Sequence, residues 1–467
     1  MIYLLRLLAL VVLCTQLFIV QSQAQNQSGK QVAQKRSDIE ELKRRIDEIQ
    51  RQNQKQIEEL QKKIEQIEAE RASEKEAAEK VIAKEKEDKD AWYNKFEAGY
   101  KKGLFFKTND GNFLMKMRLR TQFQFSVNDT DDEDTATDFR IRRFRVKWNG
   151  HAFRPWFLYT IQLDADSGEV RLRDAYFGVA YNTGIVPRVG QFKVPFNRER
   201  LTSSSSLQLV ERSIVSGEFS IGRDIGSGLY GILGNMITYG GGIFNGDGRN
   251  ARSTNSNLLY AGRIQFNPCC GKLKYNGEEF PSGGSYELVS NFGGREPIVA
   301  IGGAFYTFPG LNIARKTPDD RGIGERFVEL GIESGNVTGV TADISFKNYL
   351  FNLVAEYDGR WIDPKMTESG SLDTLYDQGF RVQGGIFILP KTLELAARFA
   401  YVDYDTGSGI TGDVRDSKWQ ITPGINYYIS KDHRWKIQLD YNFIKNTFTE
   451  SEDIDENIFR AQLQAYF

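Results

Sequence analysis

The feature that most limits how this chain can fold is a two-residue alternation of apolar and polar side chains. Successive side chains of a β-strand point to opposite faces. In residues 113–127 one face would carry Phe113, Met115, Met117, Leu119, Phe123, Phe125 and Val127, and the other Lys116, Arg118, Arg120, Gln122 and Gln124. The pattern recurs in residues 393–401, 434–443 and 457–467. One apolar and one charged face on the same strand predict a transmembrane β-barrel, in which one side meets lipid and the other meets water.

Runs of this kind predict an all-β transmembrane barrel of about sixteen antiparallel strands, an even number as in single-chain outer-membrane barrels. We place the strands near 112–127, 139–149, 155–165, 170–181, 185–194, 226–235, 237–245, 257–267, 297–308, 336–347, 349–361, 379–390, 392–404, 418–429, 433–445 and 457–467. Short turns alternate with long polar connections, although the connection at 268–296 is long where the alternation expects a short one. A soluble β-sandwich is the alternative, but it would not order its loops so regularly.

Composition agrees with a barrel and argues against other classes. Aromatic residues make up 12% of the 467 residues, and Gly numbers 44 against 11 Pro. A mean hydropathy of −0.47 excludes a bundle of membrane helices, but not a barrel, because alternation hides the apolar residues in the average. The formal charge of −1 gives no support to nucleic-acid binding.

The N-terminus predicts export. Residues 1–24 have the basic start, apolar core and small-residue cleavage site of a signal peptide. With Cys14 inside that core, the mature chain keeps only Cys269 and Cys270, whose adjacency suits free thiols or a labile disulfide better than a structural one. The two histidines, His151 and His433, have no motif around them. We therefore expect no enzyme, no cofactor and no metal site.

Residues 25–90 are expected to form a periplasmic α-helical coiled coil. Apolar residues step by three and four along Ile39, Leu42, Ile46 and Ile49, and again along Ile57, Leu60, Ile64 and Ile67, with Asn53 between the two runs. Ile at most core positions favours a trimer, whereas the core Asn favours a dimer. A single solvated helix is the other alternative. Residues 91–111 would form a linker and a short hairpin, and the barrel would occupy 112–467.

Alternation also predicts which cations face the barrel lumen. In residues 139–149 the phase slips by one near Arg142, and a bulge there would turn the flanking basic residues inward. A charge facing lipid would cost on the order of 2–4 kcal/mol at mid-membrane, so these cations belong on the water side. The predicted lumen residues are Arg118, Arg120, Arg140, Arg143, Arg145, Lys147, Arg263, Arg381, Arg398 and Lys436.

Acidic residues are also predicted to face inward, namely Asp164, Asp174, Asp343, Glu356, Asp358, Glu394 and Asp440. The lumen charges could therefore simply pair with one another. The first two strands, however, carry inward cations and no clear inward acid. This difference predicts a cationic wall rather than a uniformly cationic pore. Asp129 to Asp134 would form an acidic first loop, either solvated or bridged to lipopolysaccharide through divalent cations.

The connection from Phe196 to Asp224 would be the third extracellular loop. It offers Arg198, Arg200, the hydroxyls of Ser203, Ser204, Ser205 and Ser206, and Arg212. Arginine and serine together suit oxyanion binding, but a serine run is equally typical of flexible loop sequence.

The segment G-Q-F-K-V-P-F, followed by T-S-S and E-R and preceded by R-L-R-D-A-Y-F-G, resembles the phosphate-selective porin O/P family. The resemblance implies a homotrimer of sixteen-stranded barrels, passive anion uptake and a constricting third loop. It also implies that Lys193, Arg198, Arg200 and Ser203 to Ser206 lie near the constriction, with Arg118, Arg143 and Arg145 on the wall leading to it. The coiled coil is an addition to this pattern, and the lumen acids depart from a strongly basic channel.

The sequence therefore predicts an outer-membrane porin that passes small anions such as phosphate. Its expected partners are copies of itself, outer-membrane lipid and lipopolysaccharide, and small anions, with peptidoglycan or other envelope components as further candidates for the coiled coil. Two other functions stay open. One is a general or sugar-permeable porin whose aromatic residues line the passage, and the other is an envelope tether acting through the coiled coil.

Overall fold

A computed structural model describes residues 31–90, 95–131, 133–166, 168–234, 236–253, 256–268, 297–312, 323–367, 372–407, 409–410 and 412–467. The expected signal peptide with Cys14, and the Cys269-Cys270 pair, lie outside the described residues. The chain divides into two units, Met1–Ala91 and Trp92–Phe467.

The first unit contains one long helix, α2 (Gln31–Asp90). Its apolar seam is open on the single chain, since Ile57, Leu60, Ile64 and Ile67 are each 44–52% exposed. The earlier seam positions Ile39, Leu42, Ile46 and Ile49 have side chains outside the described set. The coiled coil thus stays a prediction, with a helix in the expected place. Among the described helices, none is both long and apolar enough to cross a lipid bilayer.

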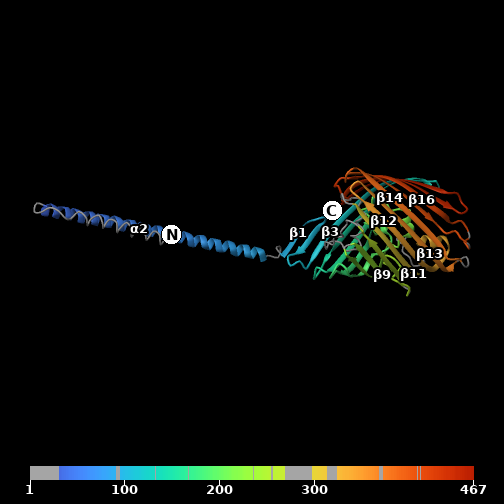
Figure 1. The fold of residues 1–467 in the computed structure, drawn as a ribbon, viewed down its shortest axis with the longest axis horizontal. Coiled ribbons are helices and arrows are strands. Elements are labelled where there is room, and N and C mark those ends of the chain that lie inside the picture. The colour runs from blue at the N-terminus through green and yellow to red at the C-terminus, as the bar shows by residue number, and fades with distance from the viewer. Residues whose placement is uncertain are drawn as a thin grey trace. The chain divides into compact units, whose positions relative to one another are not determined.

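The second unit is a closed antiparallel barrel of sixteen strands, as the alternation predicts (Figure 1). Its strands are β3 (Leu114–Thr130), β4 (Glu133–His151), β5 (Phe157–Asp166), β6 (Glu169–Val179), β7 (Val186–Lys193), β8 (Arg223–Leu233), β9 (Ile237–Phe244), β10 (Leu259–Phe266), β11 (Ile298–Asn312), β12 (Ile332–Lys347), β13 (Phe351–Thr367), β14 (Leu375–Leu389), β15 (Leu393–Asp403), β16 (Arg415–Tyr428), β17 (Trp435–Phe448) and β18 (Ile454–Tyr466). Each strand pairs with the next, and β18 closes the ring on β3 with Leu463 opposite Phe123.

The two strand faces differ as a membrane barrel requires. On the outer face, Phe123, Ile161 and Leu353 are each 43–50% exposed, which is the apolar surface that would meet lipid. On the inner face, polar side chains are buried and hydrogen-bonded, as where Gln122 donates to Gln464 at 2.6 Å. The barrel therefore has an apolar exterior and a polar interior.

A short hairpin precedes the barrel. It consists of β1 (Phe96–Tyr100) and β2 (Leu104–Thr108), and β2 pairs with the first residues of β3, with Leu104 opposite Met117. The final strand reaches β3 only as far as Leu119, where the backbone N–H and C=O groups of Leu119 and Phe467 bond to each other. The hairpin thus extends the sheet past the end of β18.

The predicted acidic first loop is wrong in its extent. Strand β3 runs to Thr130 and β4 begins at Glu133, so most of the acidic run lies within a hairpin. The strands pair out to Thr130 opposite Glu133. This outer part of β4 is exposed on both faces, so its acids can lie in a strand without meeting lipid.

The predicted bulge in β4 is present. Gln122 pairs with Arg143 and Phe123 pairs with Ile141, which leaves Arg142 as the extra residue. A bulge of this kind places residues on both sides of it on the same face of the sheet. Arg140 and Arg143 accordingly both point inward and donate to Gln124 at 3.3 Å and to Gln122 at 3.0 Å.

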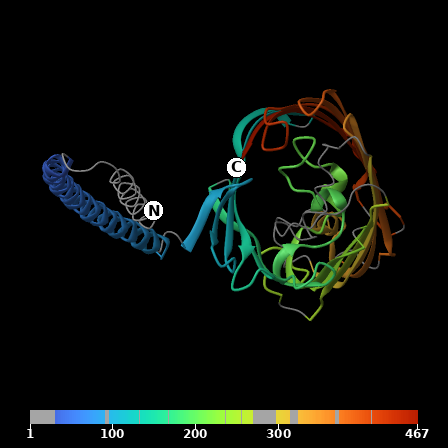
Figure 2. The same ribbon diagram turned by 60° about the vertical axis from the view of Figure 1, so that its left-hand side comes forward.

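Strand β7 leads into the feature that fills the barrel. Gly190 has a φ of +127°, and a Cβ there would lie 2.2 Å from the carbonyl oxygen of Ala175 on β6. Only glycine allows the two strands to approach so closely with this backbone conformation. After Lys193 the chain leaves the wall and turns into the lumen, as the green ribbon inside the ring shows (Figure 2).

Candidate functional site

The third connection at the long-loop end, residues 194–222 between β7 and β8, folds into the barrel interior and is called the third loop below. It carries two short helices, α3 (Arg198–Leu201) and α4 (Ile214–Phe219). It is held to strands on several sides of the barrel. These contacts are Gln122 to the Ser204 carbonyl at 3.2 Å, Gln464 to the Ser205 carbonyl at 3.1 Å, Lys436 to the Leu207 carbonyl at 2.7 Å, the Val210 N–H to Asp440 at 2.8 Å and the Glu199 N–H to Glu356 at 3.2 Å.

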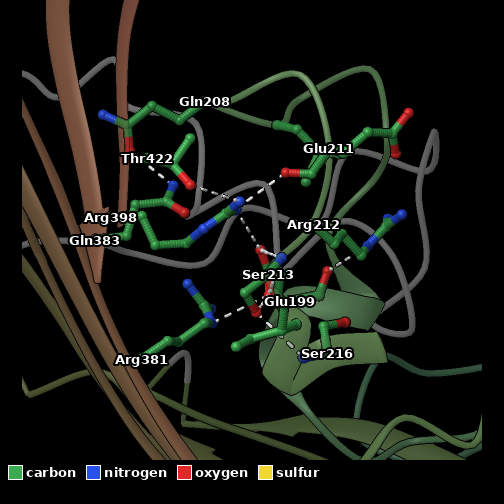
Figure 3. A network of polar contacts seen from close by, with 12 residues as sticks. Glu199, Gln208, Glu211, Arg212, Ser213, Ser216, Arg381, Gln383, Arg398 and Thr422 are labelled. Atoms are coloured by element: carbon green, nitrogen blue, oxygen red, sulfur yellow. Dashed lines mark hydrogen bonds and ion pairs between the residues drawn. The ribbon is translucent and has the colours of Figure 1, made fainter. Parts of the chain in front are cut away.

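Glu199 is the centre of the network that holds the loop in shape (Figure 3). Its carboxylate accepts from the N–H and hydroxyl of Ser213 and lies 3.3 Å from Arg381 and 3.5 Å from Arg398. Arg398 also donates to the Glu211 carbonyl at 3.0 Å. Burial alone would raise the pKa of Glu199, but the two guanidinium groups and Ser213 hold it below its usual value. The carboxylate therefore stays charged and ties α3 and Ser213, the residue before α4, to β14 and β15.

Glu211 joins the loop to the opposite wall. Its two carboxylate oxygens lie 2.6 Å from Arg142 and 2.7 Å from Arg143 on β4. Burial would raise the pKa of Glu211, yet Arg143 and Arg142 outweigh it and hold the pKa well below its usual value. The bulge at Arg142 makes this double pairing possible, because it brings two consecutive arginines to one acid.

Several cations predicted for the lumen lie beneath the loop, away from water. Arg198 pairs with Asp343 at 2.5 Å, and Arg263 bonds to the same carboxylate. The side chains of this group are nearly inaccessible, with exposures of 0% for Arg198 and Lys436, 2% for Arg398, 3% for Arg381 and 4% for Arg263. These residues hold the loop in place and do not form a surface that a passing ion could touch.

The inward acids lie in the same dry region or in ion pairs on the wall. Exposure is at most 8% for each of Asp164, Asp174, Asp343, Glu356, Asp358, Glu394 and Asp440. Asp164 pairs with Arg145 at 2.8 Å and Asp174 pairs with Arg223 at 2.9 Å. Glu394 instead accepts from neutral groups, including Gln208 of the loop at 2.7 Å. These seven acids are thus largely shielded from water.

Around the third loop, the charged side chains that keep contact with water are mainly cationic. On the third loop, the charged residues that are partly exposed are Arg200, Glu211 and Arg212, and the acid among them is already paired with two arginines. On the facing strands, Lys147, Arg173 and Lys193 are partly exposed. Arg200 lies within electrostatic range of Arg173, Lys193 and Arg212.

These cations repel one another, which is a sign of their excess over acids. Burial and the positive charges of Arg200 and Arg143 hold the pKa of Arg212 well below its usual value. Two main-chain carbonyls partly compensate, since Arg212 donates to those of Glu199 at 3.1 Å and Thr202 at 2.7 Å. A mobile anion beside this surface would relieve the remaining repulsion.

The serine run bridges the loop and the first two barrel strands. Arg145 donates to the Ser204 hydroxyl at 2.8 Å, and Arg120 lies 3.5 Å from the Ser203 hydroxyl. Ser203 is exposed, Ser206 is partly exposed, and Ser204 and Ser205 are buried. Arg118 is buried beside Tyr466, to which it donates at 3.3 Å. The structure thus brings Arg120, Arg145 and the serines together.

An aromatic cluster fills the side of the lumen near β7 to β11. Phe192, Tyr230, Phe244, Tyr306 and Phe308 are each at most 4% exposed. Arg188 lies against this cluster, with its guanidinium carbon 5.4 Å from the Phe192 ring centre and 4.5 Å from the Tyr230 ring centre, in cation–π contacts. This cluster is a packed core and does not offer its rings to water.

Sequence reasoning missed the residues that decide which charges meet water. Glu199, Glu211 and Arg142 were not among the predicted site residues. The bulge was a usable signal for Arg142, because the extra residue must leave the strand alternation. Nothing in a strand pattern shows where an irregular loop will place its acids. In the described part of the chain, no group of three or more His, Cys, Asp or Glu side chains is arranged to hold a metal ion.

Comparisons with known proteins agree with this architecture. Residues 113–287 match the family described as phosphate-selective porin O and P. An uncharacterized protein of Aquifex aeolicus (strain VF5) is 24% identical over 374 residues, which cover 72% of this chain and 82% of that protein.

Solved structures of outer-membrane proteins are similar at low identity. The DcaP channel of Acinetobacter baumannii is 14% identical with a TM-score of 0.48, over 78% of this chain and 99% of that one. OmpF of Salmonella typhi, solved with daunomycin, is also 14% identical with a TM-score of 0.48, over 79% of this chain and 100% of that one. OmpT of Vibrio cholerae in its trimer form is 12% identical with a TM-score of 0.46, over 76% and 99%.

A closed sixteen-stranded barrel with an apolar exterior, a polar lumen and an inward-folded third loop is the architecture of an outer-membrane channel, not of an enzyme. Together with the match over residues 113–287, it supports a porin in which the first half of the barrel resembles the phosphate-selective porin O and P family.

Proposed function

We propose that this porin gives passive, anion-preferring diffusion of small solutes across the outer membrane, with phosphate as the candidate solute. One observation carries the proposal, namely that the charges around the third loop that keep contact with water are mainly cationic, although many lumen cations are buried as well. The inward acids are buried beneath the third loop or in wall ion pairs, whereas Lys147, Arg173, Lys193 and Arg200 keep contact with water. A permeating ion is influenced most by the charges beside the water it moves through.

The chemistry of these groups supports an oxyanion more than a halide. Guanidinium groups bind phosphate through paired N–H donors, and serine hydroxyls add further donors. Ser203 is exposed next to Arg120, and Arg200 is partly exposed nearby on the same loop. The family's description as phosphate-selective points the same way.

A general or sugar-permeable porin is the second candidate, and the aromatic residues speak against it. A sugar path needs ring faces that are open to the passing solute. In the described lumen cluster, the rings of Phe192, Tyr230, Phe244, Tyr306 and Phe308 are buried.

The test is a charge reversal at a water-facing position, measured as the reversal potential of single channels in a planar bilayer under a KCl gradient. For Lys147→Glu, the Coulomb change on an ion ~6 Å away, screened at 0.1 M salt, is about 0.8 kcal/mol, so the anion/cation permeability ratio should fall about 15-fold. Arg154→Glu is the matched control, because Arg154 is exposed in the turn between β4 and β5 and does not lie on the lumen face of a strand.

Wild-type channels with no anion preference would refute the proposal, and so would a Lys147→Glu channel indistinguishable from Arg154→Glu. Added phosphate should also reduce the wild-type chloride current in a saturable way. A purely additive phosphate current would leave anion preference standing but remove phosphate as the preferred solute.

We further propose that α2 forms a parallel trimeric coiled coil in the periplasm and that the barrels assemble as a trimer in contact with outer-membrane lipid and lipopolysaccharide. The support is the exposed seam of Ile57, Leu60, Ile64 and Ile67, at the spacing of a coiled-coil core. A peptide of residues 31–90 should sediment as a trimer in analytical ultracentrifugation. Replacing Leu60 and Ile64 by Asn should make it monomeric, and a wild-type peptide that stays monomeric at high micromolar concentration would exclude the coiled coil.

A further inference from the structure

A second charged network connects the third loop to another loop of the barrel. Helix α5 (Ile323–Glu329) belongs to the connection between β11 and β12, and α4 belongs to the third loop. Arg415 at the start of β16 lies between them. Its guanidinium is 3.3 Å from Glu218 of α4 and 3.0 Å from Glu329 of α5.

The network closes into a ring through three other residues. Arg360 donates to the Glu218 carbonyl at 2.9 Å and pairs with Asp377 at 2.5 Å. Asp377 lies 3.6 Å from Arg326 of α5, and Arg326 pairs with Glu329 at 3.1 Å. Arginines and acids thus alternate around the ring, in the order Glu218, Arg415, Glu329, Arg326, Asp377 and Arg360.

The ring is buried at its core and packed against aromatic rings. The side chains of Arg326, Arg360 and Asp377 have no exposed surface. The guanidinium carbons of Arg326 and Arg415 each lie 4.9 Å from the Tyr404 ring centre. A charge left unpaired in such a place has no water to replace its partner, so removing one member is far more costly than the pair is stabilising.

Apolar packing joins the same two segments. Phe327 and Ile323 of α5 belong to the hydrophobic cluster that also contains Val194 and Phe196 of the third loop. Phe327 is fully buried. Helix α5 is therefore joined to the third loop at α4 through the charged ring, and it shares a hydrophobic cluster with the start of the loop.

We propose that helix α5 is a strap that fixes the third loop in its lumen position, with Glu329 and Arg415 as positioning residues for ion selectivity. The proposal rests on the function proposed above, in which the third loop determines which charges border the water-filled passage. A loop held at α4 keeps Glu199 and Glu211 at their arginines. Those pairings in turn keep the negative charges of the two acids compensated.

Glu329 should stay charged under ordinary conditions. Burial alone would raise the pKa of Glu329, but bonds from Arg415 hold it below its usual value. The strap should therefore work at neutral and mildly acidic pH alike.

The test uses the full-length channel with Glu329→Ala, and with Glu325→Ala as the matched control. Glu325 lies on the same helix and carries the same charge, but it is exposed and outside the ring. Single-channel recordings should show sublevel and noise events in Glu329→Ala about 100-fold more often than in wild type. Loss of a buried ionic partner costs ~3 kcal/mol, and each 1.4 kcal/mol changes an equilibrium constant about tenfold. Its anion preference should fall, whereas Glu325→Ala should behave as wild type.

If Glu329→Ala does not assemble, as judged by heat-dependent gel mobility, Glu329→Gln carries the test, because it keeps the side-chain shape and removes the charge. Quiet open channels with wild-type reversal potential in the assembled variant would overturn the strap. The two proposals fail separately. A wild-type channel without anion preference refutes the proposed function, while the frequency of sublevel events in Glu329→Ala still decides whether α5 holds the loop.

Discussion

Replacing Glu211 should raise the anion preference of the channel, whereas removing a cation should lower it. Its carboxylate lies 2.6 Å from Arg142 and 2.7 Å from Arg143, and its side chain is 17% exposed. Glu211→Gln keeps the shape and one hydrogen-bond acceptor but releases one positive charge at the water-facing surface. If these arginines belong to an anion path that Glu211 partly neutralises, the variant should be more anion-selective than wild type.

The size of the effect follows from Coulomb's law. One unit charge ~6 Å from a permeating ion contributes about 0.7 kcal/mol in water, and screening at 0.1 M salt reduces this to about 0.4 kcal/mol. The anion gains this energy and the cation loses it, so the permeability ratio should rise about fourfold at 0.1 M. At 1 M the screening length is ~3 Å, and the expected rise shrinks to about 1.4-fold.

The assay is the reversal potential of Glu211→Gln and wild-type channels in KCl gradients centred on low and on high salt. Asp453→Asn is a suitable control, because Asp453 pairs with Lys445 at 3.1 Å near the β17–β18 loop and its loss changes net charge by the same amount. An unchanged or lower anion preference in Glu211→Gln at low salt, with normal barrel folding, would show that Arg142 and Arg143 serve only to hold the loop.

Two further predictions concern stability. His433, in the β16–β17 turn, has a pKa well below its usual value because it is buried and lies near the positive charges of Lys436 and Lys347. As the pH falls, the unfolded chain therefore takes up the proton before the folded barrel does, so barrel stability should fall as pH drops below about 6.5. His433→Gln should flatten this dependence in urea unfolding followed by heat-dependent gel mobility, and equal slopes would contradict the reasoning. Phe123→Lys on the lipid face should destabilise the barrel by about 2–4 kcal/mol in the same assay, whereas a polar exchange at the inward-facing Gln124 should cost much less.

The barrel was predictable because one physical rule acts on every strand. Lipid on one side and water on the other impose alternation, and a charge on the wrong face costs several kcal/mol. That rule also revealed the bulge at Arg142. The alternation of apolar and polar residues shifts by one there, although the strand still has lipid on one side and water on the other, and such a shift requires an extra residue. The predicted extent of the acidic loop between β3 and β4 was wrong. Beyond the membrane the alternation rule no longer applies, and the two strands stay paired as far as Thr130 and Glu133.

The candidate site was predictable only as a set of residues, and their surroundings were not. Alternation states that Arg381 and Lys147 both face the lumen, but it does not state that the third loop covers one and leaves the other wet. The covering depends on Glu199, Ser213 and Arg398, which are far apart in sequence and meet only in the folded chain. An irregular loop has no period from which such contacts could be read.

The charge of a lumen is therefore not the sum of its inward residues. Asp343 and Glu356 count as fully as Lys147 in the sequence, yet their fields at the passage are reduced by partners within about 3 Å, such as Arg198 for Asp343 and Arg381 for Glu356. A close pair acts on a distant ion only as a dipole, which weakens faster with distance than the single charge of Lys147 does. A chain whose formal net charge is −1 can thus present a cationic surface to the solute, provided that its loop places the acids where water does not reach.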